Sequence, residues 1–397
     1  MSDINITHYL QQVENGRAYK QGNLLAAMLS FRHSHASSKR LKVPNMENTV
    51  ARYVDPPYDE LVIYHLKCLY ALDEKNILEA FQNQYELAQV FLKIFQSQKE
   101  ENWMLKVMQV ICLELRLLAC PADKQANNKK HPIESLEKTA KCLMGCFRIC
   151  AADNRSSEQD TKKWGMLTLV NQMFKVYFKI NRHQLCKPLM RAIESSNLKD
   201  RFALAQTITY KFFEGQRAMF DGDFKTANEC LSFAFLRCHK NSPKNKKSIL
   251  LYLVPVKMIL GYMPKKSLLE KYNLTEFWEV VEAVKMGNLQ KFNEVMDQYR
   301  SFFIKHNIYV IMQRLSTIAT RNLIKKVYHI VNSHQIPVEM FLKALLAMKI
   351  EDASWDEAEC LLANLILEGK VKGYISYQHD TLVVSKLTPF PVISSIK

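Results

Sequence analysis

The sequence contains few of the residues that interrupt regular structure. Its 397 residues include only 10 glycines and 12 prolines. Because Gly and Pro mark most turns and strand breaks, so few of them favour helices joined by short connections over a sheet-rich fold. Hydrophobic residues make up 48% and charged residues 24% of the chain, which is the balance of an ordinary globular protein. The length allows two or three domains with a substantial core.

Long apolar runs and paired cysteines are also missing. The most apolar segment, residues 249–263, contains Lys257 and is too short and too charged to span a bilayer. Residues 1–10 lack the basic start and apolar core of a secretory signal. The ten cysteines are scattered without a framework of spaced pairs, which favours a reducing compartment, either cytosol or nucleus. The sequence therefore predicts a soluble intracellular protein.

The motifs of the common enzyme classes do not occur: there is no GxxxxGK[ST], GxGxxG, GxSxG or HExxH. Cys142, Cys146 and Cys150 share one helical face but have no second ligand pair nearby, so they are interpreted as core residues and not as zinc ligands. His33 and His35 flank Ser34 in a polar stretch without a third ligand, which favours a surface loop. The sequence predicts a protein that is not an enzyme, with no catalytic residues, metal or cofactor.

An excess of one charge is what the chain does contain. The formal net charge is +16, and residues 124–247 hold 24 Lys and Arg against 11 Asp and Glu. Residues 121–132 and 241–247 are predicted to be two basic loops within or next to this segment. Such a field attracts polyanions, either nucleic acid or an acidic protein segment, although a solvated basic surface explains it equally well.

Helical periodicity dominates the first three quarters of the chain. Apolar residues recur at helical spacing over residues 61–70, 77–95, 169–180, 185–193, 210–220, 224–238, 277–285 and 289–299. Short polar turns separate the members of each pair and supply residues that cap the next helix. The spacing between pairs is irregular, so the pattern predicts a degenerate, TPR-like solenoid of stacked helix pairs. Such a stack presents an extended surface that suits other proteins better than small substrates.

The last hundred residues follow another pattern. Residues 299–315 and 321–331 are predicted as two helices, and Pro337 is expected to open a third that ends at residue 348. Ser354 and Glu357 form an S-x-x-E capping box for a fourth helix, which Gly369 ends. Alternating residues over 371–378 and 381–386 predict a hairpin. Three helices followed by a hairpin are the order of a winged helix, so the predicted fold is mainly α, a solenoid that ends in this module.

Charge is unevenly divided over the predicted winged helix. Its presumed recognition helix, residues 356–369, carries four acidic side chains and no Lys or Arg, so it would repel the phosphates of a major groove. Its acidic residues are therefore predicted to contact a protein partner: Asp356, Glu357 and Glu359. The basic side chains lie elsewhere, and they either grip a nucleic-acid backbone without reading bases or form a solvated rim around a protein contact. These candidates are Arg321, Lys325, Lys326, Lys370, Lys372 and Lys386.

A helical array that runs into a winged helix resembles the PCI domain. The chain is similar to one branch of that family along residues 6–391. The similar segments are DPPYDE at 55–60, KEENW at 99–103, KWGM at 163–166, LVNQ at 169–172, LCKPL at 185–189, SSNLKD at 195–200, RNLIKKVY at 321–328 and GKVKGYIS at 369–376. That branch is the PCI-domain-containing protein of the TREX-two complex, which exports mRNA at the nuclear pore. The implied organisation is helical repeats over residues 1–205, the helical part of the PCI domain over 206–300, and its winged helix with a C-terminal tail over 301–397.

The resemblance also implies partners. In that family the winged helix pairs with that of a large Sac-type, germinal-centre-associated scaffold. A small acidic protein of the DSS/Sem type clamps the helical region, and the paired winged helices form a platform for RNA and DNA without sequence preference. We therefore expect a nuclear scaffold that is present at the pore, shuttles to the cytoplasm and is not inserted in a membrane. The alternative is a protein-only PCI subunit of a signalosome-like or proteasome-lid-like assembly.

Overall fold

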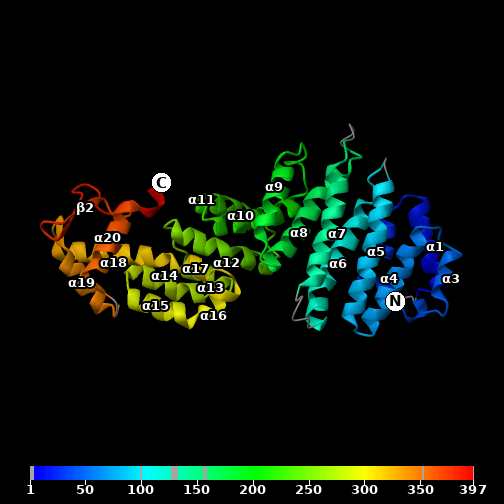
Figure 1. Cartoon of the computed structure of the whole chain (residues 1–397), viewed down its shortest axis with the longest axis horizontal. Helices are drawn as coiled ribbons and strands as arrows, with labels where there is room; N and C mark the ends of the chain where they lie inside the picture. The colour runs from blue at the N-terminus through cyan, green and yellow to red at the C-terminus, as the bar shows by residue number, and fades with distance from the viewer. Residues whose placement is uncertain (1–3, 99–100, 127–132, 155–158, 351–352, 397) are drawn as a thin grey trace. The chain divides into compact units, whose positions relative to one another are not determined.

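The computed structural model describes residues 4–98, 101–126, 133–154, 159–350 and 353–396. The chain forms two compact units, one up to Tyr210 and one from Lys211 onwards. Each is built almost entirely from helices, as the sequence predicts, and the chain can be followed by colour in Figure 1. The three-part division at residues 205 and 300 stays a prediction.

The first unit is a stack of helices that follow one another in space as they do along the chain. Neighbours α4 and α5, α5 and α6, α6 and α7, and α7 and α8 pack against each other (Figure 1). The α-helices are α1 (Ile6–Ala18), α2 (Gly22–Met28), α3 (Met46–Ala51), α4 (Tyr58–Asp73), α5 (Ile77–Ser97), α6 (Leu105–Ala126), α7 (Glu134–Ala151), α8 (Met166–Lys179) and α9 (Cys186–Glu194). The 3-10 helices are η1 (Ser34–Ser37), η2 (Lys39–Leu41), η3 (Lys162–Gly165) and η4 (His183–Leu185).

The second unit continues the helical pattern, and helix α10 (Leu204–Asp221) leads into it across the unit boundary. Its helical part consists of α11 (Phe224–Arg237), α12 (Pro243–Ile259), α13 (Lys266–Lys271), α14 (Glu276–Met286), α15 (Leu289–Gln298), α16 (Arg300–Lys305) and α17 (Tyr309–Gln313). Its winged helix consists of α18 (Leu315–Val331), β1 (Gln335–Pro337), α19 (Val338–Ala347), α20 (Trp355–Leu367), β2 (Gly373–Ser376) and β3 (Thr381–Val384), followed by η5 (Ile393–Ser395).

The turns begin helices by the capping mechanism that the sequence predicts. The side chain of Asn76 accepts a hydrogen bond from the backbone N–H of Glu79 at the start of α5. Asp223 does the same at α11 and Asn288 at α15. Each cap satisfies one of the backbone donors that the first turn of a helix leaves free. A short polar residue before an apolar periodic run therefore fixes where these helices start.

The winged helix packs three helices against a small antiparallel sheet of order β1-β3-β2. In the register, β1 places Ile336 opposite Leu382, and β2 places Gly373 opposite Val384. Ile336, Leu382 and Val384 are buried with Phe341 of α19 and with Leu362 and Leu365 of α20. The alternation along β3 therefore puts one face of the sheet in the core and leaves the other outside.

Four expectations about secondary structure were wrong. Residues 299–315 do not form one helix, because Asn307 is left-handed (φ 57°) and separates α16 from α17. Residues 243–247 are not a loop: Pro243 occupies the first turn of α12, where its fixed φ suits the helix. Pro337 caps α19 from outside and ends strand β1, which the sequence did not reveal. Residues 121–126 belong to α6, and the rest of the predicted loop, 127–132, lies outside the described residues.

The three cysteines of α7 lie in the core of the first unit, as predicted. Cys142, Cys146 and Cys150 are at most 2% exposed, and the Sγ atoms of Cys112 and Cys146 are 3.9 Å apart. Burial raises the pKa of the Cys150 thiol to about 12. These thiols therefore behave as small apolar side chains at neutral pH.

Candidate nucleic-acid and partner interface

Arg321, the first of the predicted basic residues, is part of the internal structure of the winged helix. Its side chain points inward from α18 and the residue is only 6% exposed. Nη2 donates to the carbonyl oxygen of Pro391 at 2.6 Å, and Nε donates to that of Lys370 at 3.2 Å. The guanidinium also lies over the ring of Phe390, 5.8 Å from its centroid. Arg321 therefore holds the wing and residues 389–391 against α18, and a direct contact with nucleic acid would require it to leave these partners.

The hairpin brings two of the wing lysines together. Lys372 precedes β2 and Lys386 follows β3, and both are exposed. The backbone N–H of Ser385 donates to the carbonyl oxygen of Lys372 at 2.8 Å, so the two lysines lie at the same end of the hairpin. Lys370 differs, because its Nζ forms an ion pair with Glu368 at 2.5 Å and its side chain is only 17% exposed. Lys372 and Lys386 are the wing lysines best placed to meet a phosphate backbone.

Lys325 and Lys326 are exposed on α18, one turn beyond Arg321. Arg321 joins this helix to the backbone of Lys370 at the start of the wing. The sequence puts Arg321 and Lys325 on one helical face by their spacing. Their surroundings nevertheless differ, because the wing covers the first and leaves the second in solvent.

Helix α20 presents its acidic residues at its start. Asp356 and Glu357 are exposed in the first turn, where the helix dipole favours negative charge. Ser354 accepts a hydrogen bond from the backbone N–H of Glu357, which is one half of the predicted capping box. Glu359 accepts from Nε1 of Trp355 at 3.1 Å. Asp356 and Glu357 are therefore open to a partner, whereas Glu359 is partly engaged within its own helix.

Several large apolar side chains of the winged helix are exposed, which the sequence analysis missed. Leu367 at the end of α20 is 85% exposed and Ile330 on α18 is 77% exposed. The others are Leu346, Tyr374, Tyr377, Leu387 and Val392. They are distributed over α18, α19, α20 and the hairpin with the segment after it, and Leu367 is the most exposed of those on the helices. Ile330 lies within the predicted helix over residues 321–331, and its apolar character alone does not reveal that it is exposed.

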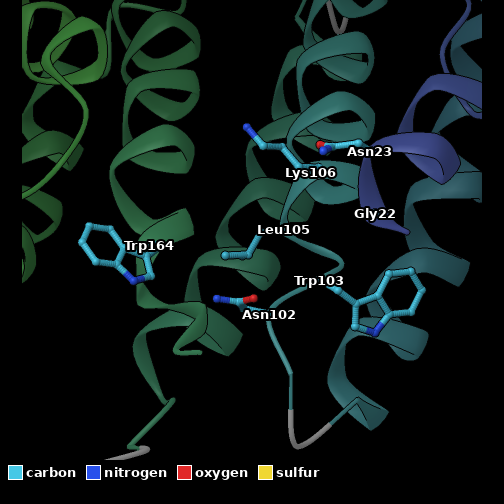
Figure 2. A pocket seen from close by; sticks show the side chains of 7 residues that line it. All are labelled: Gly22, Asn23, Asn102, Trp103, Leu105, Lys106 and Trp164. Atoms are coloured by element: carbon cyan, nitrogen blue, oxygen red, sulfur yellow. The ribbon is translucent and has the colours of Figure 1, made fainter. Parts of the chain in front are cut away.

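A shallow cleft of about 340 Å³ opens on the first unit between the start of α2 and the start of α6 (Figure 2). Its lining residues are Gly22, Asn23, Asn102, Trp103, Leu105, Lys106 and Trp164. Figure 2 shows Asn102 and Leu105 between the two indole rings, which lie on opposite sides. The lining contains no carboxylate, imidazole or thiol, and Lys106 is its one titratable side chain, so the cleft holds no nucleophile–base pair of the usual kind.

Three imidazoles lie in a row at η1, the inner two buried and His33 exposed. His35 and His65 are both 0% exposed and their Nε2 atoms are 3.0 Å apart, while His33 Nδ1 lies 3.2 Å from His35 Nδ1. The prediction of a surface loop was therefore wrong for His35, because η1 folds this side chain against α4. Burial lowers the pKa of His35 to about 4 and that of His65 well below its usual range.

The first unit also buries one carboxyl group. Glu114 of α6 is 1% exposed and accepts hydrogen bonds from the Ser30 hydroxyl at 2.5 Å and the Phe31 N–H at 3.2 Å. Burial raises its pKa to about 7 despite these donors. Among the described residues, no group of three His, Cys, Asp or Glu side chains is arranged to hold a metal ion. Over the same described residues, which include both units, no helix is long and apolar enough to cross a membrane.

Comparison with known proteins agrees with this architecture. The family model of the PCI domain matches residues 296–386, which cover the winged helix and the helices just before it. The "PCI domain-containing protein 2" of Danio rerio is 49% identical over 398 residues, and that of Xenopus laevis is 48% identical over 398 residues. Both alignments cover all of this chain and all of the relative. A more distant relative, the "Protein CSN12 homolog" of Schizosaccharomyces pombe, is 29% identical over 93% of this chain and 90% of its own length. The chain belongs to the family of PCI domain-containing protein 2.

Proposed function

We propose that the protein is a non-enzymatic scaffold subunit of a nuclear mRNA-export complex, the TREX-two complex. In this role it binds a large Sac-type, germinal-centre-associated scaffold and a small acidic DSS/Sem-type protein. It also contributes to a platform that holds RNA and DNA without sequence preference. The observation that supports the proposal best is the division of the winged helix into basic, acidic and apolar exposed groups.

Each group suits a different partner. The exposed Lys372 and Lys386 suit phosphates, whose contacts position a nucleic acid without reading its sequence. Leu367 and the acidic start of α20 suit a protein partner. The carboxylates of α20 would repel a nucleic acid, and burial of an exposed leucine side chain in an interface contributes favourable free energy. The net charge of +13 over residues 124–247 suits a small acidic partner.

The first test measures RNA binding by the reconstituted complex. Replacing Lys372 and Lys386 with Glu is expected to weaken the binding of a single-stranded RNA. It is also expected to lower the slope of log affinity against log salt by about 0.7 for each phosphate that is no longer neutralised. Replacing Lys285 and Lys349, which are also exposed lysines of the second unit, is the matched control. If the two pairs of substitutions had equal effects on RNA binding, the wing lysines would not be part of the RNA-binding platform.

The second test asks which assembly the protein enters. Affinity purification from nuclear extract is expected to recover the export scaffold, and Leu367→Glu is expected to reduce that recovery because it places a charge in an apolar contact. The alternative is a protein-only scaffold of a signalosome-like or proteasome-lid-like assembly, which the acidic start of α20 favours. Recovery of proteasomal or signalosome subunits, together with RNA binding that does not depend on salt, would support this alternative instead.

A further inference from the structure

A positive patch of the second unit lies outside the winged helix, where α11 turns into α12. Residues 237–247 read RCHKNSPKNKK and contain five Lys and Arg without a carboxylate. Because α12 starts at Pro243, Lys244 and Lys247 are three residues apart on one helical face, and both are exposed. We call this patch the basic shoulder; it consists of Arg237, Lys240, Lys244, Lys246 and Lys247, with Lys271 and Lys305 from neighbouring helices.

One hydrogen bond and one electrostatic effect indicate that the neighbouring helices add to the same patch. Nζ of Lys247 donates to the carbonyl oxygen of Asn273 at 2.8 Å, two residues after Lys271 at the end of α13. His306 follows α16, and its pKa is lowered by burial and then by the positive charges of Lys305 and Lys247. The shoulder therefore gathers basic residues from the end of α11, the start of α12 and the ends of α13 and α16.

Few carboxylates balance these charges. Glu270 precedes Lys271 on α13, but its carboxylate lies 4.0 Å from Nζ of Lys266, which is not part of the shoulder. Glu276 acts on His306 from the start of α14. Among the described residues, no Asp or Glu lies within ion-pair distance of the exposed lysines at 240, 244, 247, 271 and 305. Like charges held together without counter-charges repel each other, so a bound polyanion gains from relieving this repulsion.

The aromatic rings of the shoulder argue for phosphate groups over an acidic protein segment. Nζ of Lys246 lies 4.6 Å from the ring centroid of Phe235 and donates to its carbonyl oxygen. The ring of Tyr272 packs edge-on against Phe235 at 6.1 Å. The rings are therefore covered by lysine stems and by each other, and the exposed apolar side chains next to the basic residues are Leu236 beside Arg237 and Ile304 beside Lys305. Exposed ammonium groups among exposed Asn side chains suit a sugar–phosphate backbone.

We propose that the basic shoulder binds the phosphate backbone of RNA or DNA as a second contact site, separate from the wing. This inference shares its ligand class with the proposed function, and it assigns residues 237–247 of the basic segment to nucleic acid and leaves residues 124–236 to the small acidic partner. The shoulder adds affinity and no sequence preference, because nothing in it reaches for base edges.

The experiment measures binding of the full chain to fluorescent oligo(U) RNA over a salt series at and below physiological ionic strength. The variant Lys240→Gln/Lys244→Gln is expected to lower the slope of log affinity against log salt by about 1.4, about 0.7 for each phosphate. The control Lys225→Gln/Lys349→Gln makes the same charge change at exposed sites away from the shoulder and is expected to leave the slope within error. Far-UV circular dichroism checks that both variants fold.

Three outcomes would overturn the inference. The two variants can lose affinity equally, which would mean that net charge and not the shoulder matters. The shoulder variant can bind RNA like the unaltered chain. The shoulder variant can also lose binding to polyglutamate while its affinity for RNA is unchanged, which would mean that the shoulder binds an acidic protein. The wing variant Lys372→Glu/Lys386→Glu is measured in parallel, so that failure at the wing is distinguished from failure at the shoulder.

Discussion

Arg321 offers the sharpest test of how the winged helix is held together. Replacing it with Met keeps an unbranched apolar stem but removes the donors to the carbonyl oxygens of Pro391 and Lys370. A hydrogen bond to a charged group contributes about 1.5–3 kcal/mol. Both acceptors are partly exposed, so water replaces some of these hydrogen bonds. Since the cation–π interaction with Phe390 also disappears, we expect the wing to be destabilised by about 2–4 kcal/mol.

The measurement is hydrogen exchange of backbone amides, because a chain of two units does not give a single well-defined unfolding free energy. The N–H of Lys372, bonded to the carbonyl oxygen of Pro389, and that of Ser385 report on the wing directly. Both are expected to exchange about 30- to 1000-fold faster in Arg321→Met, the range that corresponds to about 2–4 kcal/mol. In Arg321→Lys the exchange rates of these amides are expected to lie between those of the unaltered chain and those of Arg321→Met, since an ammonium group does not reproduce the planar fork of a guanidinium.

The matched control is Lys325→Met, which removes one positive charge from the exposed side of the same helix. It is expected to leave the exchange of the wing amides unchanged and to reduce RNA affinity. The reasoning would be refuted if Arg321→Met left wing exchange unchanged and lowered the salt slope of RNA binding as Lys325→Met does. Arg321 would then contact phosphate, as the sequence analysis predicted.

Two further predictions concern the buried groups and the glycine turns. Between pH 7 and 5 the free energy of unfolding of the first unit is expected to fall by about 1–2 kcal/mol. The folded state keeps His35 and His65 neutral because their pKa values are lowered, so it loses stability relative to the unfolded state as the pH falls through the unfolded value of about 6.5. The raised pKa of Glu114 acts in the opposite direction, and the two histidines together outweigh it. Hydrogen-exchange protection factors of the buried amides of the first unit at the two pH values measure this, and greater protection at pH 5 would show that the carboxyl dominates. Gly287→Ala is expected to lower the stability of the second unit by at least about 2 kcal/mol more than Gly222→Ala. Both glycines have left-handed backbone geometry, but a Cβ added at Gly287 would lie 2.5 Å from the backbone nitrogen of Leu323. A Cβ added at Gly222 would meet only a flexible side chain, at 3.9 Å. Equal losses of amide protection in the second unit of the two variants, measured by hydrogen exchange, would contradict the close backbone contact.

The sequence determined most of the helical architecture, because its signals are local. A polar cap such as Asn76 or Asp223 before an apolar run fixes a helix start whatever surrounds it. The same holds for the alternation that predicted β2 and β3. One exception is short-range as well: the helix over residues 299–315 fails at Asn307, a non-glycine residue in left-handed geometry that periodicity cannot reveal. Strand β1 was missed for a different reason, because it forms by pairing with the distant strand β3.

Only the tertiary structure decided what the candidate residues are available to do. Arg321 and Lys325 have the same charge and share a helical face in the sequence, yet one is buried and the other exposed. The difference comes from a carbonyl group 70 residues further along the chain, at Pro391. His35 and the basic shoulder follow the same rule, since their partners lie on other helices. Charge and periodicity are properties of neighbours in sequence, whereas burial depends on which distant segments meet, and that is settled only when the chain packs.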